Sequence, residues 1–145
     1  MKDITEKQIT ARTAHATGSV RVSPTTLQRI REGNLPKGEP FGFARAAGFL
    51  AAKRTDDLLP HCHPIPLEAL TIDFVCSDES SSIRIDARAK THARTGLEME
   101  VLTAVSVAAL TLYDLLKPVD SSLVIEGIRL LEKTGGKSGN WQSPV

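Results

Sequence analysis

The chain has 145 residues, with 18 lysines and arginines against 17 aspartates and glutamates, and 41% hydrophobic residues. This length fits one compact domain, and the composition is typical of a folded protein rather than a disordered one. A net charge of +1 gives no electrostatic footprint for a nucleic acid or an anionic membrane, so we expect neither as a partner.

The sequence also favours a cytoplasmic location. The N-terminal residues contain no apolar run that would serve as a secretory signal. The longest apolar stretch, Val101–Leu116, is interrupted by polar residues and is too short to span a bilayer. Cys62 and Cys76 do not suggest a disulfide framework, which indicates a reducing compartment.

The first forty residues are expected to contain an arm, two short elements and a turn-rich loop. Residues 1–17 are polar and weakly patterned, which predicts a mobile arm or loop. Alternating residues at 19–22 predict a short strand, and residues 25–31 a two-turn helix that Gly33 closes. Residues 34–40 are dense in turn formers.

The remaining elements have clearer patterns. Small, helix-compatible residues predict a helix from 41 to about 57. Apolar residues alternate over 70–76 and again over 83–90, which predicts a β-hairpin. A helix over 98–117 follows, ended by Pro118, and then a last strand over 123–133.

This order is β-α-β-β-α-β, the ferredoxin-like plan of the α+β class, in which both helices pack on one face of an antiparallel sheet. Residues 1–145 are therefore expected to form a single domain, with the arm at its start and a glycine-rich tail over 134–145.

The helix over 98–117 has a narrow polar stripe of mostly small hydroxyl residues. Charge lies only at the ends of this stripe, with Glu100 at one end and Asp114 and Lys117 at the other. Such a stripe suggests that a neighbour or a ligand covers it. Asp114 and Lys117 are spaced to form a surface ion pair, or an acid–base couple if burial lowers the pKa of the lysine. Spacing alone does not decide between these two readings.

Two further segments contain groups suited to ligand binding. His61-Cys62-His63 lies between prolines on a constrained loop, from which imidazoles can position a polar substrate. Zinc would need further ligands, which Cys76, His15 or His92 could supply, but no recognised ligand pattern is present, and we expect no metal.

The run Gly135-Gly136-Lys137-Ser138-Gly139 is similar to part of a phosphate-binding P-loop. Leu131 stands where the first glycine of that motif is required, and too few residues follow for its helix, so we reject a nucleotide triphosphatase. The tail can still offer backbone N–H groups or Lys137 to an anion. Lys37, like Lys137, lies in a turn-forming loop, and a rigid turn there would hold its side chain in a fixed direction.

Several runs together resemble the MoaC family of cyclic pyranopterin monophosphate synthases. The match covers nearly the whole chain, and its elements occur in the family's order. These are Phe43–Gly48, Ala51–Thr55, Leu59–Pro64 with its C-H-P, Thr95–Glu100 (T-G-x-E-M-E), Ala108–Asp114 with Lys117 (L-T-x-Y-D-x-x-K), and Gly135–Gly139.

The resemblance implies a lyase of molybdenum cofactor biosynthesis. Such an enzyme converts (8S)-3',8-cyclo-7,8-dihydroguanosine 5'-triphosphate to cyclic pyranopterin monophosphate and diphosphate, without a cofactor. It also implies a ferredoxin-like fold and a homohexamer, a trimer of dimers, with active sites between subunits.

The resemblance also assigns site residues. Asp114, Lys117 and Lys37 match catalytic positions, and we expect Asp114 and Lys117 to exchange protons during the rearrangement. Glu100 and His63 are expected to orient the base, and Arg12 and Lys53 to bind the phosphates. The substrate-binding positions together are His61, Cys62, His63, Glu98, Met99, Glu100, Arg12 and Lys53.

Three alternatives remain at this point: a ferredoxin-like RNA-binding module, a metal-dependent hydrolase built on the His61–His63 loop, and a family member that no longer catalyses. The first lacks strand aromatics and a basic face. The intact set of site residues argues against the last. The main hypothesis requires the site residues to converge into one pocket, across protomers if not within one.

Overall fold

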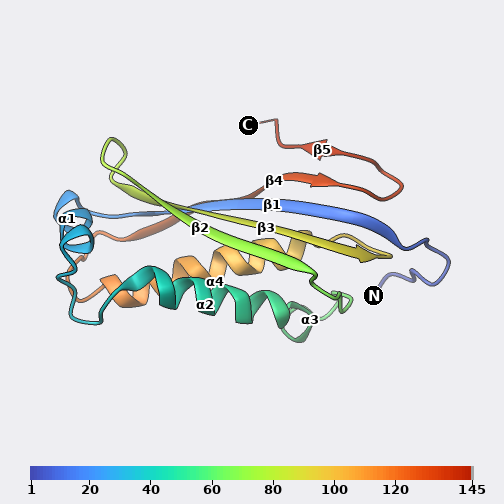
Figure 1. Ribbon diagram of the computed structural model, residues 1–145, viewed down its shortest axis with the longest axis horizontal. Coiled ribbons are helices and arrows are strands. Elements are labelled where there is room, and N and C mark those ends of the chain that lie inside the picture. The colour runs from blue at the N-terminus through green and yellow to red at the C-terminus, as the bar shows by residue number, and fades with distance from the viewer. Residues whose placement is uncertain (145) are drawn as a thin grey trace.

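The structure is a computed structural model that describes residues 1–144, and it contains a five-stranded antiparallel sheet and four helices (Figure 1). The sheet order is β2-β3-β1-β4-β5. The elements are β1 (Thr10–Arg21), α1 (Pro24–Glu32), α2 (Pro40–Lys53), α3 (Thr55–Leu58), β2 (Ala69–Ser77), β3 (Ser82–Ala93), α4 (Glu98–Leu116), β4 (Val124–Thr134) and β5 (Trp141–Gln142).

The two long helices, α2 and α4, lie side by side on one face of the sheet, as Figure 1 shows. With β5 set aside, the strand order and the antiparallel pairing are those of a ferredoxin-like sheet. The predicted fold class is confirmed. The short helices α1 and α3 and the edge strand β5 are additions to the six-element plan.

The prediction of an irregular arm over residues 1–17 is wrong from Thr10 onward, because β1 begins there and is twelve residues long. Its inward residues are small, and they include Ala14, Ala16 and Gly18. A Cβ atom at Gly18 would lie 2.7 Å from Cγ1 of Val105 on α4. These residues form strands weakly on their own, but they let α4 lie directly on β1.

Two other boundaries differ from the prediction. The helix expected over 41–57 ends at Lys53, and a separate single turn, α3, follows Arg54. The tail over 134–145 is not wholly irregular, because Trp141 and Gln142 pair with β4 at Lys133 and Glu132.

The core lies between the sheet and the α2–α4 layer. At Gly48 a Cβ atom would lie 2.5 Å from Cδ1 of Ile72 and 3.1 Å from the Ala104 carbonyl oxygen, so glycine permits the contact between α2 and α4. The apolar stretch Val101–Leu116 was expected to be too short to span a bilayer, but α4 also includes residues 98–100. With 19 residues, it is the one helix within residues 1–144 that is long and apolar enough to cross a membrane. Its buried side packs on the sheet and on α2, as in the core helix of a folded domain.

Candidate active site

The predicted site residues gather at the two ends of α4. Asp114 lies fourteen positions after Glu100 along this helix. At about 1.5 Å per residue they lie about 21 Å apart along the axis. The groups therefore form two clusters within one chain rather than a single pocket.

The C-terminal cluster consists of Lys37, Asp114 and Lys117. The Lys117 Nζ atom lies 2.9 Å from Asp114 Oδ1. The Lys37 Nζ atom donates to the Asp114 backbone carbonyl at 3.0 Å and lies 3.4 Å from its Oδ1 atom. A loop and a helix that are 77 residues apart in the chain thus meet at one carboxylate.

Local structure explains how the loop presents Lys37. The next residue, Gly38, has a φ of 88°, and its N–H donates to the Leu35 carbonyl oxygen in a turn. Glu39 then caps α2 by accepting hydrogen bonds from the backbone N–H groups of Phe41 and Gly42. The cap fixes the chain two residues after Lys37 and directs that lysine toward the end of α4.

The charges of the C-terminal cluster stabilise one another. The ammonium of Lys117 lowers the pKa of Asp114, and Lys37 adds to this effect. Asp114 in turn raises the pKa of Lys117. All three side chains are exposed, so of the two readings the single chain contains the ion pair, and burial does not lower the pKa of Lys117 there.

The N-terminal cluster consists of Glu98, Glu100, Lys133 and Cys62. Lys133 Nζ lies 3.0 Å from Glu98 Oε1. Glu100 is buried, its Oε1 atom accepts from the Cys62 thiol at 3.8 Å, and its Oε2 atom has no partner among residues 1–144. Met99, between the two carboxylates, is exposed.

Burial changes the protonation of this cluster. Desolvation above all, together with the negative charges of Glu98 and Asp56, raises the pKa of Glu100 to about 7. Desolvation also raises the pKa of Cys62 to about 11, with Glu100 contributing. Near neutral pH the Cys62 side chain is therefore a thiol, and Glu100 is able to gain or lose a proton.

The other predicted residues surround the N-terminal cluster less closely. His61 is exposed and His63 half-buried on the loop that Cys62 brings to α4. Arg12 lies at the start of β1 and donates to the carbonyls of Ala93 and Arg94, just before α4 begins. Lys53 is exposed at the end of α2, and no interaction joins its side chain to the cluster.

The possible metal ligands do not converge. His15 pairs with Asp86 at 2.8 Å, and His92 pairs with Glu68 at 3.0 Å, both on the sheet. In the part of the chain that the structure describes, no three His, Cys, Asp or Glu side chains form a group able to hold a metal ion.

Lys133 is the residue that the sequence analysis missed. It lies on β4, and only the pairing of β4 with β1, in which Ala14 is opposite Lys133, places it beside the start of α4. No short motif marks it. The register of two strands that are far apart in the chain was the missing information.

Together, the fold and the two clusters define a ferredoxin-like α+β protein with charged groups gathered at both ends of one helix. A protein-family model described as the MoaC family matches residues 1–136, and the chain belongs to this family.

Three relatives illustrate the similarity. The chain is 53% identical, over its whole length, to the molybdenum cofactor biosynthesis bifunctional protein of Synechococcus elongatus, of which it spans 46%. It is 50% identical to a cyclic pyranopterin monophosphate synthase of Thermomicrobium roseum, over 98% of this chain and 86% of that protein. A synthase of the same name from Nostoc sp. is 49% identical over all of this chain and 86% of its own length.

Proposed function

We propose that this chain is a cyclic pyranopterin monophosphate synthase of molybdenum cofactor biosynthesis. The observation that carries this proposal is the name shared by relatives that are 49–50% identical to the chain and 86% covered by it. The substrate is (8S)-3',8-cyclo-7,8-dihydroguanosine 5'-triphosphate, and the products are cyclic pyranopterin monophosphate and diphosphate.

The C-terminal cluster is suited to proton transfer and charge stabilisation. Lys117 is an ammonium beside the Asp114 carboxylate, so the pair can give a proton and take one back as the purine ring opens and the pyranopterin closes. Lys37 adds a second cation that can neutralise an oxygen that becomes negative in the transition state. These three residues are the proposed catalytic groups.

The N-terminal cluster is suited to binding the substrate. Glu100 and His63 orient the base, and Arg12 and Lys53 bind the phosphates. Glu98, Met99, His61 and Cys62 line the same region. Cys62 acts as a hydrogen-bond donor rather than as a nucleophile, because its pKa of about 11 keeps it protonated.

The distance between the clusters indicates a composite site. Groups about 21 Å apart on one rigid helix cannot act on the same atoms of one substrate. A second copy that meets this chain across a two-fold axis, with its α4 antiparallel, brings the N-terminal cluster of one protomer to the C-terminal cluster of the other. We therefore propose that each active site contains one cluster from each of two subunits.

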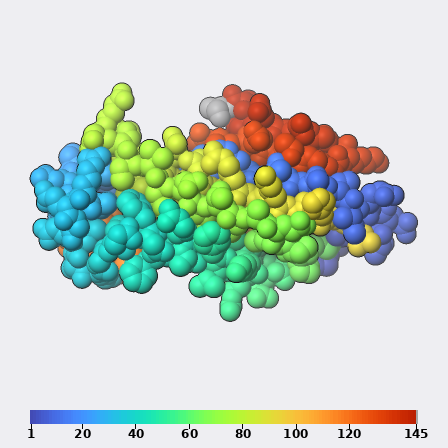
Figure 2. Space-filling model, viewed as in Figure 1, coloured from blue at the N-terminus to red at the C-terminus, as the bar shows by residue number. Residues whose placement is uncertain are grey.

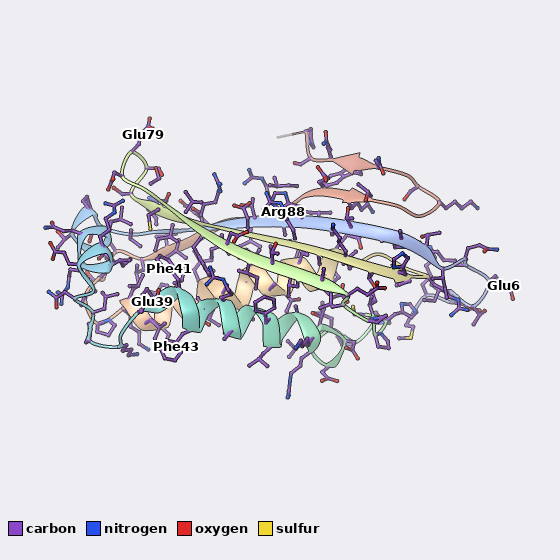
Figure 3. All side chains as sticks on the ribbon, viewed as in Figure 1. Glu6, Glu39, Phe41, Phe43, Glu79 and Arg88 are labelled. Atoms are coloured by element: carbon purple, nitrogen blue, oxygen red, sulfur yellow. The ribbon has the colours of Figure 1, made fainter. Side chains whose placement is uncertain are left out.

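The helix layer offers a surface for such a contact. Several large apolar side chains of α2 and α4 are exposed: Phe43, Leu50, Met99, Leu110 and Tyr113. The surface of α2 is uncovered along the edge of the molecule in Figure 2, and Phe43 lies on the side of α2 away from the sheet in Figure 3. Three such dimers form the proposed cytoplasmic hexamer. Light scattering, which measures the mass of the assembly, tests the number of subunits.

The activity is tested by incubating the purified chain with the cyclic triphosphate and measuring pterin product by mass spectrometry and diphosphate by a coupled assay. We expect equal amounts of both products. Asp114→Ala and Lys117→Ala are each expected to lower turnover at least a hundredfold, as the loss of a general acid or base does. Lys90→Ala, an exposed lysine on β3, is the control. Near-wild-type turnover in both cluster variants would falsify the catalytic assignment.

A further inference from the structure

A second group of cations lies where the N-terminal residues meet the glycine-rich turn after β4. Two cavities of about 540 and 460 Å³ share Lys7, Arg12 and Lys137 in their walls. We call this region the arm–turn basin. Glu6, which lies in its wall, is at the end of the molecule opposite Glu39 and the Lys37 loop in Figure 3.

The three cations that the two cavities share are not paired with carboxylates. Within residues 1–144, none of Lys7, Arg12 and Lys137 forms an ion pair. Arg12 donates to two backbone carbonyls instead. Lys2 adds a fourth cation to the walls, and the carboxylates there are Glu6 and Asp3, the latter held by Thr5. The basin is therefore net positive.

The backbone that carries these lysines is held in place. Lys7 follows a turn in which its N–H donates to the Ile4 carbonyl at 3.1 Å, and Arg94 Nε donates to the Lys7 carbonyl at 3.2 Å. The two links fix the segment before β1 against the end of β3. Lys7 is thus half-buried and positioned rather than free in solvent.

Glycines allow the turn after β4 to lie close to β1. Gly135 and Gly136 have φ values of 90° and 81°, which favour glycine. A Cβ atom at Gly135 would overlap the Ala11 carbonyl oxygen, and one at Gly136 would overlap the guanidinium of Arg12. The turn can lie this close to β1 only because side chains are absent, and this closeness places Lys137 beside Arg12.

We propose that the arm–turn basin binds the β,γ-diphosphate part of the substrate and holds it while it departs. This inference rests on the proposed function. In that reaction a ribose-derived hydroxyl bonds to the α-phosphorus and loses its proton to a base. The bond from the α-phosphorus to the β-bridging oxygen breaks, and its electron pair leaves with the diphosphate. Cations that contact the leaving group stabilise this developing charge.

The position of the basin fits this role. Arg12 contacts the residues just before α4, and Lys137 follows Lys133 of the N-terminal cluster by four residues. Thr10 also lines the basin, and its buried hydroxyl has no partner among the residues described. Lys7 is therefore an additional binding residue that no motif indicates, and Lys137, which the glycine-rich motif offers to an anion, contacts the diphosphate.

The test is calorimetric titration of the full chain with inorganic diphosphate, with orthophosphate for comparison. We expect diphosphate to bind at least tenfold more tightly than orthophosphate. Lys7→Gln and Lys137→Gln should each weaken diphosphate binding about tenfold, as the loss of one hydrogen bond to a charged group does. Gly136→Ala keeps every charge but displaces the turn, and it should weaken binding similarly. Lys90→Gln, which removes a lysine outside the basin, should bind as the wild type does.

Kinetics separate the possible failures. If the inference is correct, the lysine variants raise the KM for the triphosphate and the inhibition constant of diphosphate together, while their melting temperatures stay at the wild-type value. If the chain forms product but both variants keep the wild-type KM and diphosphate affinity, the basin is not the diphosphate site and the proposed function stands. If diphosphate binding depends on the lysines but no pterin forms, the basin stands and the proposed function is wrong.

Discussion

The proposed composite active site predicts how mixed assemblies of two variants, each inactive alone, will behave. Glu100→Ala removes the buried carboxylate of the N-terminal cluster, and Asp114→Ala removes the carboxylate of the C-terminal cluster. Each variant alone is expected to lose at least a hundredfold in turnover, because every site contains the damaged group. The two substitutions lie about 21 Å apart on α4, so neither one disturbs the other cluster of its own chain.

Mixing restores activity only if the clusters come from different chains. In assemblies formed randomly from equal amounts, an intact site needs its N-terminal cluster from an Asp114→Ala chain and its C-terminal cluster from a Glu100→Ala chain. Each requirement is met in half of the cases, so about a quarter of the sites are fully wild type. Turnover per site should therefore rise from below one-hundredth to about one-quarter of the wild-type value.

The assay uses co-expressed variants with two affinity tags, purified over both so that only mixed assemblies remain. The matched control pairs Asp114→Ala with Lys117→Ala, both in the C-terminal cluster. No arrangement of these chains gives an intact site, so activity should stay at the residual level. If the Glu100→Ala and Asp114→Ala assembly also stays there, the two clusters do not form a shared site and the two-subunit arrangement is refuted.

Three further predictions concern protonation and packing. The folded state holds Glu100 at a pKa of about 7 against an ordinary 4.5, so between these pH values the folded protein binds more protons than the unfolded one, and the free energy of unfolding falls by up to about 3 kcal/mol as pH rises. Denaturant titrations at pH 5 and pH 8 measure this fall in wild type and in Glu100→Gln, which should show none of this contribution. An equal fall in both proteins would contradict the raised pKa. Cys62→Ser should keep kcat within a few-fold, because the protonated thiol donates a hydrogen bond that a hydroxyl can replace, whereas a hundredfold loss would indicate a nucleophile. Gly48→Ala should lower the free energy of unfolding by about 1–3 kcal/mol, since the added methyl group meets Ile72 and the Ala104 carbonyl. Thermal melts at equal protein concentration should therefore show a lower melting temperature for the variant, and equal melting temperatures would contradict the tight contact between α2 and α4.

Local patterns were sufficient for most of the fold. The alternation over β2 and β3, Gly33 after α1 and Pro118 after α4 each marked a boundary that the structure has within a few residues. The end of β1 was predicted as a short strand over 19–22, but residues 10–18 were missed because their small side chains suit a distant partner, α4, rather than a local strand preference. The contact of Gly18 with Val105 on α4 requires small residues on β1, and small residues are weak predictors of a strand.

The site was less accessible from the sequence. The Asp114–Lys117 pair follows from spacing on one helix, and the structure contains it. Lys37 reaches Asp114 from 77 residues away, and Lys133 reaches Glu98 through a strand register. Neither contact leaves a local pattern in the sequence. The raised pKa of Glu100 is equally hidden, because it arises from burial by the surrounding fold.

The proposed sharing of the site between subunits rests on the length of α4. Glu98 and Glu100 of the first motif and Asp114 of the second lie on α4, and no proline or glycine interrupts the 19 residues of this helix. An uninterrupted helix is a rigid rod of about 1.5 Å per residue, so the spacing of the two motifs fixes the distance between their charges. We therefore propose that a second copy of the chain, with its α4 antiparallel to the first, brings both motifs to one substrate. The rigid length of α4 supports a site shared between two subunits, and activity in the mixed assemblies would test it.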